Sequence, residues 1–539
     1  MSSPTYDLVI KNGFIIDGTG NPGFKADLAI KGEQITEIAS QIDKKSQQVI
    51  DAKGKNVVPG FIDPHVHEEF IVLEDGKFEA FLRQGVTTII NGNCGHSVTP
   101  GDSKKIFEYM YKNGLLSSLD YYAENQWCSL QEYIKLVKNK GFNINMGILL
   151  GHGTIRWSVM GGSKNRKPTK KETELIAEKI KEGLKAGALG LSTGLAYIPS
   201  KYADTKELIK AAELVRKEDG IYTSHLRSYI GVLKAVKEAI QIGKSAKVRV
   251  QVSHLTPTVP EAFDEVLKAR EAGLEIAIDT IPKSSGHCIR KDRLLQSIMA
   301  SVSDLFEKGL DNLNKALKDP QLRNKIKKEA RIFSGKMSNM YLINTDDKKL
   351  EEKSLASLSK EYNKDPKDLL LDLLLNDKVQ FTLWNGGFRK KEFPGTIYPD
   401  NIADNPLVMV GSDRIFGENN NPYVWYELFR TGAFPIFFNM MKEKGVRTEE
   451  IIRRLTSLPA QQFRLTNRGL LKQGMKADIS IIDFEQFSFP DDKKRGYKDP
   501  LVFAEGVKYV IVNGQVVLKT GIVENTKAGS FLGKNGRVL

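Results

Sequence analysis

The central part of the chain alternates short apolar runs with longer amphipathic stretches. The short runs have the length of buried strands, and stretches such as residues 170–186 and 231–242 repeat apolar residues at helical spacing. Strands alternating with helices predict parallel βα units, and roughly eight or nine units favour a (β/α)8 barrel over a doubly wound sheet. The expected strands lie within residues 59–67 and at 87–91, 145–150, 189–192, 221–224, 248–253, 275–279, 381–383 and 407–411.

Both ends of the chain show a different pattern, in which short β-like runs are separated by glycine turns. The dipeptide Asn513-Gly514 is favoured in the type I′ turn of a two-residue hairpin. We therefore predict a small discontinuous β-sandwich domain made of residues 1–58 and 468–539. The barrel domain, residues 59–467, is inserted between its two parts.

The alternation of strands and helices breaks at about residues 287–378. Lysine-rich helical segments and an Asp-Asp-Lys-Lys loop take its place. A connection of this length within a compact domain is uncommon unless it carries structure or function of its own. We interpret the segment as an inserted helical subdomain on the loop side of the barrel.

Composition and charge narrow the class of protein. The 539 residues, 40% of them hydrophobic, can bury a large core. The formal net charge of +14 comes from lysines interspersed with acidic residues, as on solvated helix faces, so we predict no nucleic-acid partner. Without an apolar run of about 18 residues or a signal-like start, we predict no membrane association. Three scattered cysteines do not form a disulfide framework, and the chain is expected to be cytoplasmic.

Polar residues able to bind a metal follow the predicted strands. His65 and His67 are two residues apart, which directs both imidazoles to one side of a strand. A barrel collects the carboxyl ends of its strands at one face, where catalytic residues lie. Any one of these residues is more simply explained as structural, but together they form a ligand set that Zn²⁺ accepts, and zinc activates water for hydrolysis. The other residues at strand ends are Cys94, His225, His254 and Asp413.

Longer motifs around these residues carry a resemblance to a known family. They are residues 59–67 (Pro-Gly-Phe-Ile-Asp-Pro-His-Val-His), 85–95, 151–156, 190–197, 224–228, 251–254, 411–413, 456–461, 474–478 and 509–514. On these motifs the chain resembles the amidohydrolase superfamily and, within it, the N-acyl-D-amino-acid deacylases, also called D-aminoacylases. The similarity runs from about residue 6 to the C-terminus and is weakest across the insertion.

The resemblance implies a zinc site at the face of the barrel. In D-aminoacylases a cysteine replaces the carboxylated lysine that bridges the metals of many relatives. The matching positions imply that Cys94, His225 and His254 bind one zinc ion tightly. His65 and His67 would line a second, weaker metal position.

The resemblance also implies roles in the reaction. Asp413 matches the general base, which takes a proton from the zinc-activated water and passes it to the leaving amine. Tyr197 and Arg227 stand at family positions near the substrate, and Arg227 fits a structural ion pair equally well. The implied partner is a small N-acyl amino acid.

Departures from the family motifs keep alternative functions open. Thr256 stands where the family often has a basic residue, and residues 279–282 and 421–423 also differ from the family segments. The first hypothesis is a zinc-dependent enzyme that hydrolyses an N-acyl-D-amino acid to a carboxylate and a D-amino acid. The alternatives are a cyclic amide hydrolase, like dihydroorotases and hydantoinases, and a catalytically silent binding protein.

Two histidines near the motifs have no assigned role. His96 follows Cys94 in a glycine-rich turn, and His152 follows the strand predicted at residues 145–150. For His152 we favour a structural hydrogen bond over a direct part in catalysis.

Overall fold

The computed structural model describes most of the chain. It covers residues 5–490 and 502–539, apart from residues 75, 114, 117–124, 256–258, 283–286, 292–293, 296–297, 299–301, 303–309, 331–339, 386–399, 416–425 and 428–430. No helix in these ranges combines the length and the apolar character that crossing a membrane requires.

Eight parallel strands form the barrel, which confirms the predicted fold class. Their order around the sheet is β17-β13-β12-β11-β10-β9-β8-β6. Strands buried on both faces favour continuous apolar runs, and every residue of β9 is buried. The strands are β6 (Phe61–Asp63), β8 (Val86–Asn91), β9 (Asn145–Gly151), β10 (Gly190–Gly194), β11 (Ile221–His225), β12 (Arg249–Val252), β13 (Ile276–Thr280) and β17 (Val408–Val410).

The first and last strands meet just beyond their barrel segments. There β7 (Val66–His67) pairs in parallel with β18 (Arg414–Ile415). The backbone N–H of Asp413 donates to the carbonyl of His65 at 2.8 Å. Closure of the barrel therefore places the residues after β6 directly beside the residues after β17.

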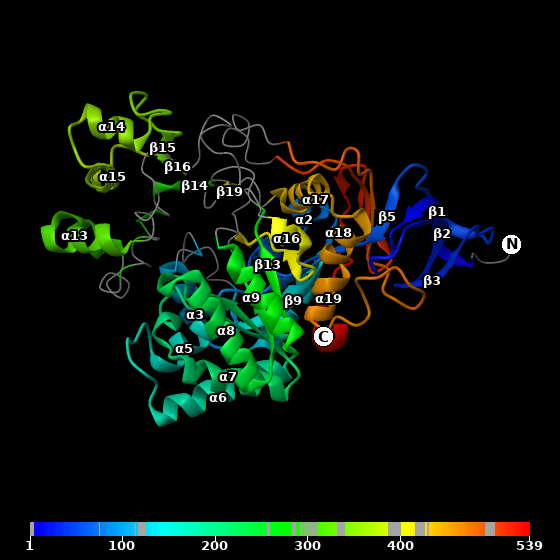
Figure 1. Ribbon diagram of the computed structural model, residues 1–539, viewed down its shortest axis with the longest axis horizontal. Coiled ribbons are helices and arrows are strands. Elements are labelled where there is room, and N and C mark those ends of the chain that lie inside the picture. The colour runs from blue at the N-terminus through cyan, green and yellow to red at the C-terminus, as the bar shows by residue number, and fades with distance from the viewer. Residues whose placement is uncertain are drawn as a thin grey trace.

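Amphipathic helices cover the outside of the barrel (Figure 1). In α6 (Lys170–Lys185), Thr169 and Glu172 form a capping box at the N-terminus, and Ile176, Ile180 and Leu184 lie buried four residues apart on one face. The other helices of this part of the chain are α1 (Ile71–Glu74), α2 (Glu79–Leu82), α3 (Ser103–Lys112), α4 (Leu130–Lys140), α5 (His152–Met160), α7 (Thr205–Lys217), α8 (Val232–Ala246), α9 (Pro260–Glu271), α16 (Asp400–Asp404), α17 (Ala433–Glu443), α18 (Thr448–Leu455) and α19 (Ser457–Gln462).

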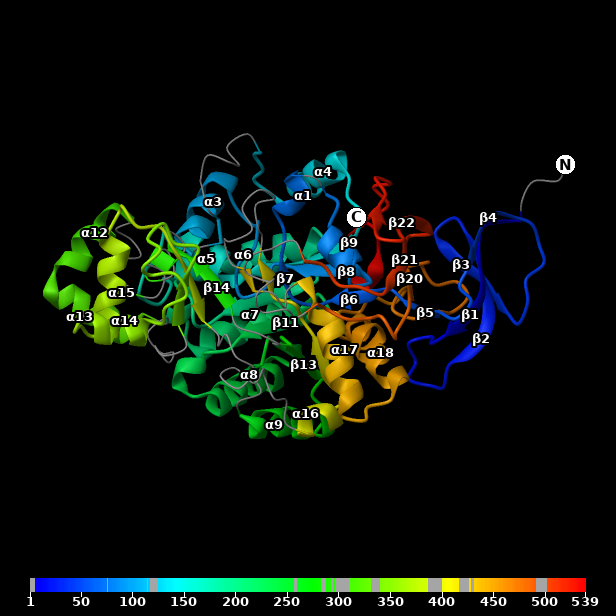
Figure 2. The ribbon, with the colours of Figure 1, turned by 90° about the horizontal axis from the view of Figure 1, so that it is seen from above.

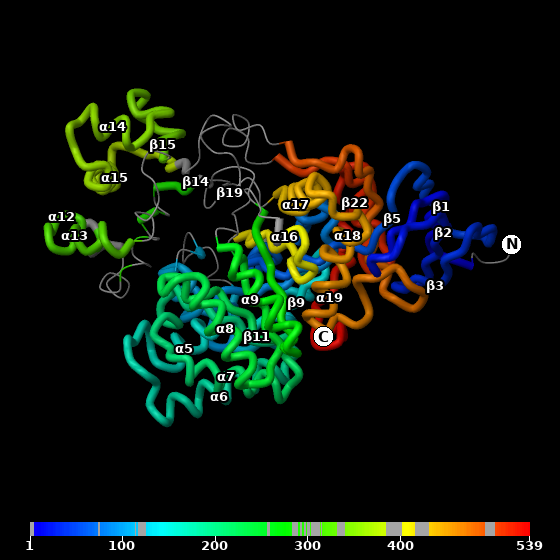
Figure 3. The backbone as a smooth tube through the Cα atoms, in the orientation of Figure 1, coloured from blue at the N-terminus to red at the C-terminus, as the bar shows by residue number. Residues whose placement is uncertain are grey.

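Strands from both chain ends form one nine-stranded sheet. In the trace of Figure 3 the first strands and the last strands lie side by side, and β5 pairs antiparallel with β20. Asn513 and Gly514 both have positive φ, 46° and 82°, as a type I′ turn between β21 and β22 requires. The strands are β1 (Tyr6–Ile15), β2 (Phe24–Lys31), β3 (Gln34–Ala39), β4 (Ser46–Asp51), β5 (Asn56–Pro59), β20 (Ile479–Ile482), β21 (Val507–Val512), β22 (Gln515–Lys519) and β23 (Ile522–Val523).

The segment that interrupts the barrel pattern has its own hydrophobic core. It lies at one end of the molecule and strands β1–β4 lie at the other (Figures 1 and 2). Besides the helices expected there, it contains an antiparallel sheet that the sequence interpretation did not include. Within the segment lie α12 (Leu310–Lys318), α13 (Pro320–Glu329), α14 (Leu355–Glu361), α15 (Pro366–Leu375), β14 (His287–Arg290) and β15 (Met340–Ile343). Strands β16 (Thr382–Asn385) and β19 (Tyr426–Glu427), which come later in the chain, complete the sheet.

One predicted barrel strand belongs to this second sheet instead. Residues 381–383 were expected in the barrel, but β16 pairs antiparallel with β14 and β15. Phe381 and Leu383 are buried in the core of the inserted segment. A short apolar run does not reveal which of two cores buries it, so periodicity alone could not separate the two positions.

The end of the chain closes the amino-terminal end of the barrel. Strand β24 (Phe531–Leu532) pairs in parallel with Met146 and Gly147 at the start of β9. Leu532 is fully buried against apolar residues from barrel strands, including Ile62 and Leu149. A two-residue strand is too short to predict from sequence pattern, yet it completes this core.

We predict that Leu532→Ala destabilises the whole protein. Loss of a fully buried leucine side chain costs about 2–5 kcal/mol, because apolar burial is lost and a cavity remains. Urea unfolding followed by circular dichroism should give a lower midpoint. Val538→Ala is the matched control, since Val538 is 42% exposed and its loss should change little. Equal midpoints for the two variants would contradict the role of this tail.

Candidate metal centre

Every predicted metal ligand and the predicted base lie at the carboxyl edge of the barrel. His65 and His67 follow β6, Cys94 follows β8, His225 ends β11, His254 follows β12 and Asp413 follows β17. Parallel strands bring these positions to one face, as the sequence pattern indicated.

Three of these residues have left-handed backbone conformations. The φ angles are 53° at Cys94, 35° at His254 and 48° at Asp413. Such conformations cost a non-glycine residue on the order of 1–3 kcal/mol and often occur at functional sites. In the same turn Gly92 has φ of 77°, and a Cβ there would lie 2.1 Å from the carbonyl oxygen of Leu149. The turn after β8 is thus shaped to present the thiol of Cys94.

Cys94, His225 and His254 form a compact three-ligand group. The sulfur of Cys94 lies 3.5 Å from Nδ1 of His225 and 3.3 Å from Nε2 of His254, and the two nitrogens are 2.8 Å apart. A tetrahedral zinc ion sets such ligand atoms roughly 3.3–3.6 Å apart. The donor set therefore fits zinc after the two nitrogens separate by about half an ångström, and a tetrahedral ion would keep a fourth position for water.

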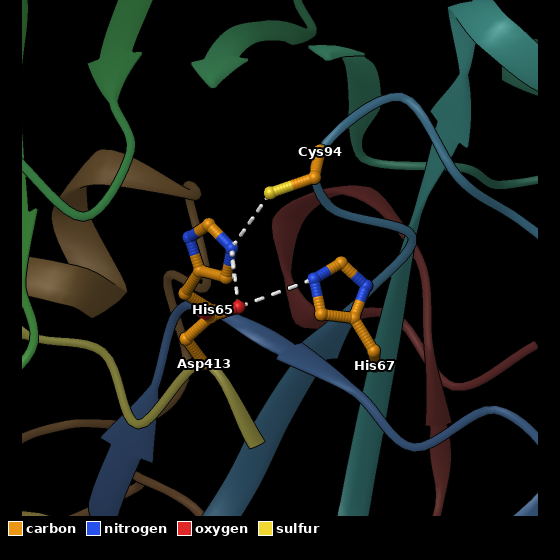
Figure 4. A group of neighbouring side chains, drawn as sticks. All are labelled: His65, His67, Cys94 and Asp413. Carbon is orange, nitrogen blue, oxygen red and sulfur yellow. Dashed lines mark hydrogen bonds and ion pairs between the residues drawn. The ribbon is translucent and has the colours of Figure 1, made fainter. Parts of the chain in front are cut away.

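A second group adjoins the first and shares its sulfur. Figure 4 shows His65, His67 and Asp413 converging beside Cys94. Nε2 of His65 lies 3.3 Å from the Cys94 sulfur. Oδ1 of Asp413 lies 3.5 Å from Nε2 of His65 and 3.3 Å from Nε2 of His67. Cys94 is the common member of the two groups and occupies a bridging position.

The surrounding imidazoles favour the thiolate form of Cys94. Burial by itself would raise the pKa of this thiol, but the facing rings of His65, His254 and His225 lower that pKa well below its ordinary value. The thiolate is the form that binds a metal. The electrostatics and the distances therefore agree on a ligand role.

Buried carboxylates hold the ligands from behind, and the sequence analysis did not identify them. Asp279 Oδ1 accepts the backbone N–H of His254 at 2.7 Å and lies 3.1 Å from Nδ1 of His65. Asp63 accepts the backbone N–H groups of His65 and Ser412. Carboxylates in such positions orient metal-binding imidazoles. The available signal was the location of Asp279 near the end of a predicted barrel strand.

The two predicted substrate residues have different surroundings. The ring of Tyr197 packs against the ring of His225, with centroids 4.6 Å apart. The guanidinium of Arg227 instead donates to Glu238 and to the carbonyls of Lys201 and Ala203. The structure brings Tyr197 to the ligand groups and places Arg227 in a network of structural contacts.

His152 makes structural contacts, as expected. Its Nδ1 lies 3.0 Å from the hydroxyl of Ser200, and its Nε2 lies 3.2 Å from Oε1 of Glu207. Glu207 also pairs with the buried Arg156 at 2.9 Å. Burial by itself would raise the pKa of Glu207, but His152 and Arg156 lower it to about 2.

We predict a pH-dependent stability contribution from this buried carboxylate. The folded pKa of Glu207 is about 2 and lies below its ordinary value of 4.5, so the contribution is present above pH 4.5 and is lost as the pH falls toward 2. Glu207→Gln should lower the free energy of unfolding by up to about 3 kcal/mol at pH 7. The deficit should shrink between pH 4.5 and pH 2 in urea unfolding curves.

The exposed Glu213 on the same helix provides the control. Glu213→Gln should unfold like the wild-type protein at every pH. A deficit of Glu207→Gln that stays constant down to pH 2 would contradict the electrostatic origin of the effect.

Some positions discussed above lie outside the described residues. They include Thr256 and residues 421–423, where the sequence departs from the family motifs. Strand β14 begins at His287 and includes Cys288, but the side chains of these two residues are also outside the description.

The strand order defines a (β/α)8 barrel. The two adjoining groups of metal-binding side chains at the carboxyl edge of its strands form a candidate metal centre. The chain belongs to the amidohydrolase family, which matches residues 48–285 and 408–518. The unmatched stretch between these segments contains most of the elements around the second hydrophobic core.

Individual relatives support the narrower resemblance. The chain is 25% identical to D-aminoacylase of Alcaligenes xylosoxydans xylosoxydans over 99% of this chain and 98% of the relative. It is 27% identical to N-acyl-D-aspartate deacylase of the same organism, over 95% and 92% of the two chains. A crystal structure of N-acyl-D-glutamate deacylase from Bordetella bronchiseptica, complexed with zinc and a phosphonate inhibitor, has a TM-score of 0.72 at 24% identity and covers 98% of this chain and 99% of that chain. The predicted resemblance to N-acyl-D-amino-acid deacylases is confirmed.

Proposed function

We propose that the protein is a cytoplasmic, zinc-dependent hydrolase of N-acyl-D-amino acids. The observation that carries the proposal is the sulfur of Cys94, which two adjoining ligand groups share beside the carboxylate of Asp413. The names of the relatives, which act on N-acyl-D-amino acids, support the same substrate class. The products are a carboxylate and a free D-amino acid.

In this proposal the two ligand groups differ in strength. Cys94, His225 and His254 would hold the tightly bound zinc, because this group combines a thiolate with two imidazoles whose nitrogens lie 3.5 and 3.3 Å from the sulfur. His65 and His67 line the weaker second position. When bound, zinc lowers the pKa of a coordinated water to roughly 7 and supplies the nucleophile.

Asp413 moves the proton in this reaction. Its Oδ1 faces the nitrogens of His65 and His67 at 3.5 and 3.3 Å, while 16% of its side chain remains exposed. The carboxylate can therefore reach both the ligand groups and a molecule that enters from the open side. It takes a proton from water and delivers it to the nitrogen of the departing amine.

Tyr197 and Arg227 contribute in different ways to substrate binding. Tyr197 lies against His225 and is the more direct candidate for contact with the substrate. Arg227 ties its own loop to the carbonyls of Lys201 and Ala203, and it supports the substrate side of the site through that loop. A guanidinium already engaged by Glu238 has fewer donors left for a substrate carboxylate.

A panel of amides tests the proposal. Zinc-reconstituted protein is incubated with N-acetyl-D-amino acids, their L-enantiomers, dihydroorotate and hydantoin, and the released amine or acid is measured. Preferential hydrolysis of the D-enantiomers is the expected result. Turnover confined to the cyclic amides would favour the alternative hydrolase class. Full zinc occupancy without turnover of any amide would favour a catalytically silent binding protein.

A further inference from the structure

Six aromatic side chains at the carboxyl edge form a closed circuit. Going round it, neighbouring ring centroids are 5.6, 6.2, 5.0, 4.6, 4.4 and 4.9 Å apart. Four members are proposed metal ligands and a fifth is the proposed substrate contact, which leaves one without a role. In order, the members are His65, His67, His96, Tyr197, His225 and His254.

His96 is the unassigned member. It lies two residues after Cys94, is 3% exposed, and packs between the rings of His67 and Tyr197. It belongs to neither group of ligand atoms that lie within 4.8 Å of one another. A role as a metal ligand is therefore not indicated, although the ring is part of the wall of the same site.

The hydroxyl of Tyr109 contacts one of the two ring nitrogens of His96. The hydroxyl of Tyr109 lies 2.8 Å from Nδ1 of His96 and 3.4 Å from the carbonyl oxygen of Gly95. If the hydroxyl donates to Nδ1, the hydrogen of a neutral ring resides on Nε2. If Nδ1 donates to the hydroxyl, that hydrogen resides on Nδ1 and the hydroxyl donates to the carbonyl of Gly95. Nε2 faces away from Tyr109, and among the described residues no side chain or backbone group accepts its hydrogen bond.

We propose that Nδ1 of His96 accepts the hydrogen bond of Tyr109, and that Nε2 donates one to a substrate sp² oxygen, in the amide carbonyl or the carboxylate of an N-acyl amino acid. The inference rests on the proposed function, since that function supplies the acceptor. No hydrogen bond within the described part of the chain engages Nε2 of His96, so this nitrogen is available to a substrate oxygen, and the hydrogen bond contributes more when that oxygen is charged. Tyr109 is a positioning residue, because it acts by orienting and polarising the ring of His96.

Three substitutions of His96 test the contact. Phe retains a flat ring without nitrogens, Asn retains an amide near the position of Nδ1, and Gln places an amide N–H near the position of Nε2. We expect kcat/KM to fall in His96→Phe and His96→Asn, because each loses one hydrogen bond to the substrate. The loss should be about 10-fold for a neutral acceptor and about 100-fold for a charged acceptor. His96→Gln should recover most of the activity. Zinc content should stay unchanged in all three variants.

Substrates that lack the carboxylate identify the acceptor. An N-acetyl amine retains the amide carbonyl but has no carboxylate. If the fold-loss of His96→Phe is the same on this substrate, the contact is to the carbonyl; if the loss disappears, the contact is to the carboxylate. Wild-type kcat/KM in His96→Phe on every substrate would overturn the proposal, and so would loss of zinc from that variant.

The tautomer of His96 provides a readout that does not depend on activity. Long-range ¹H–¹⁵N spectra of zinc-reconstituted, histidine-labelled protein should show the proton of His96 on Nε2. Tyr109→Phe should weaken this preference, and Tyr111→Phe in the same helix is the control. A proton fixed on Nδ1 would overturn the proposal. Wild-type protein that hydrolyses only cyclic amides would refute the proposed substrate, and the three variants are then compared on that cyclic amide.

Discussion

The Cys94→Ala variant is expected to lose its tightly bound zinc and its hydrolytic activity together. The sulfur of Cys94 lies within 3.5 Å of nitrogens from His65, His225 and His254, so one substitution removes a ligand atom from both groups. Loss of an outer partner that only orients a ligand typically costs 10- to 100-fold in metal affinity. Loss of the shared thiolate should exceed this range, and we expect at least a 10²-fold weaker zinc affinity.

The measurement is a competition between protein and a zinc chelator, combined with metal analysis of purified protein. Cys128→Ala is the matched control, because Cys128 is an exposed free cysteine, whereas Cys94 is buried. The control should bind one zinc ion per chain with wild-type affinity. If both variants retain equal zinc under the same chelator, Cys94 is not a ligand and the proposed centre is wrong.

The positions of the ligands followed from the barrel pattern because they depend on few assumptions. Once strands alternate with helices, the residues after each strand must share one face, and this placed Cys94, His225, His254 and Asp413 together. No knowledge of loop conformation was needed for that step. The sequence therefore predicted which ligand residues lie close together, but it did not predict the backbone conformations and hydrogen bonds that orient them.

The supporting geometry could not be read from the sequence. The residue types do not predict a positive φ at Cys94, His254 or Asp413, because surrounding contacts impose the left-handed backbone conformation on such residues. The contact of Asp279 with both His65 and the backbone of His254 joins residues that are far apart in the chain. Such long-range polar contacts leave no local periodicity.

The choice between two cores was equally hidden in the sequence. Residues 381–383 (Phe-Thr-Leu) and strand β24 (Phe-Leu) are both short segments without a distinctive local signal. Residues 382–383 pair within the sheet of the inserted segment, and β24 pairs with the start of β9 at the amino-terminal end of the barrel. Only the arrangement of elements around each core decides these positions, and composition does not encode it.

The closure of the barrel explains how Asp413 comes to face the second ligand group. Asp413 and His67 are each followed by a charged residue, and these residues form an ion pair: Nε of Arg414 lies 2.6 Å from Oε1 of the fully buried Glu68. Arg414 lies in β18, and Glu68 directly follows β7, the strand that pairs with β18. This contact holds the two strand ends together and so fixes the separation between the carboxylate and the imidazoles.

Asp413→Asn is expected to lower kcat by about 10²- to 10⁴-fold, the range typical of a positioned acid–base group. Asparagine has nearly the same size and keeps an oxygen near the positions of His65 and His67, so zinc content and KM should change little. What it lacks is the ability to accept a proton from water and return it to the leaving amine. The loss should therefore fall on the chemical step, which single-turnover measurements isolate from substrate binding.

The exposed Asp404 provides the comparison for this substitution, since Asp404→Asn makes the same chemical change a few residues earlier in the chain. Its kcat and zinc content should equal those of the wild-type protein. If Asp413→Asn instead retains kcat within a few-fold at full zinc occupancy, another group transfers the proton. If it loses zinc, the carboxylate serves mainly as a ligand. A large fall in kcat with zinc retained is the result that distinguishes a base from a ligand, because asparagine cannot accept the proton, whereas loss of a ligand would lower the zinc content.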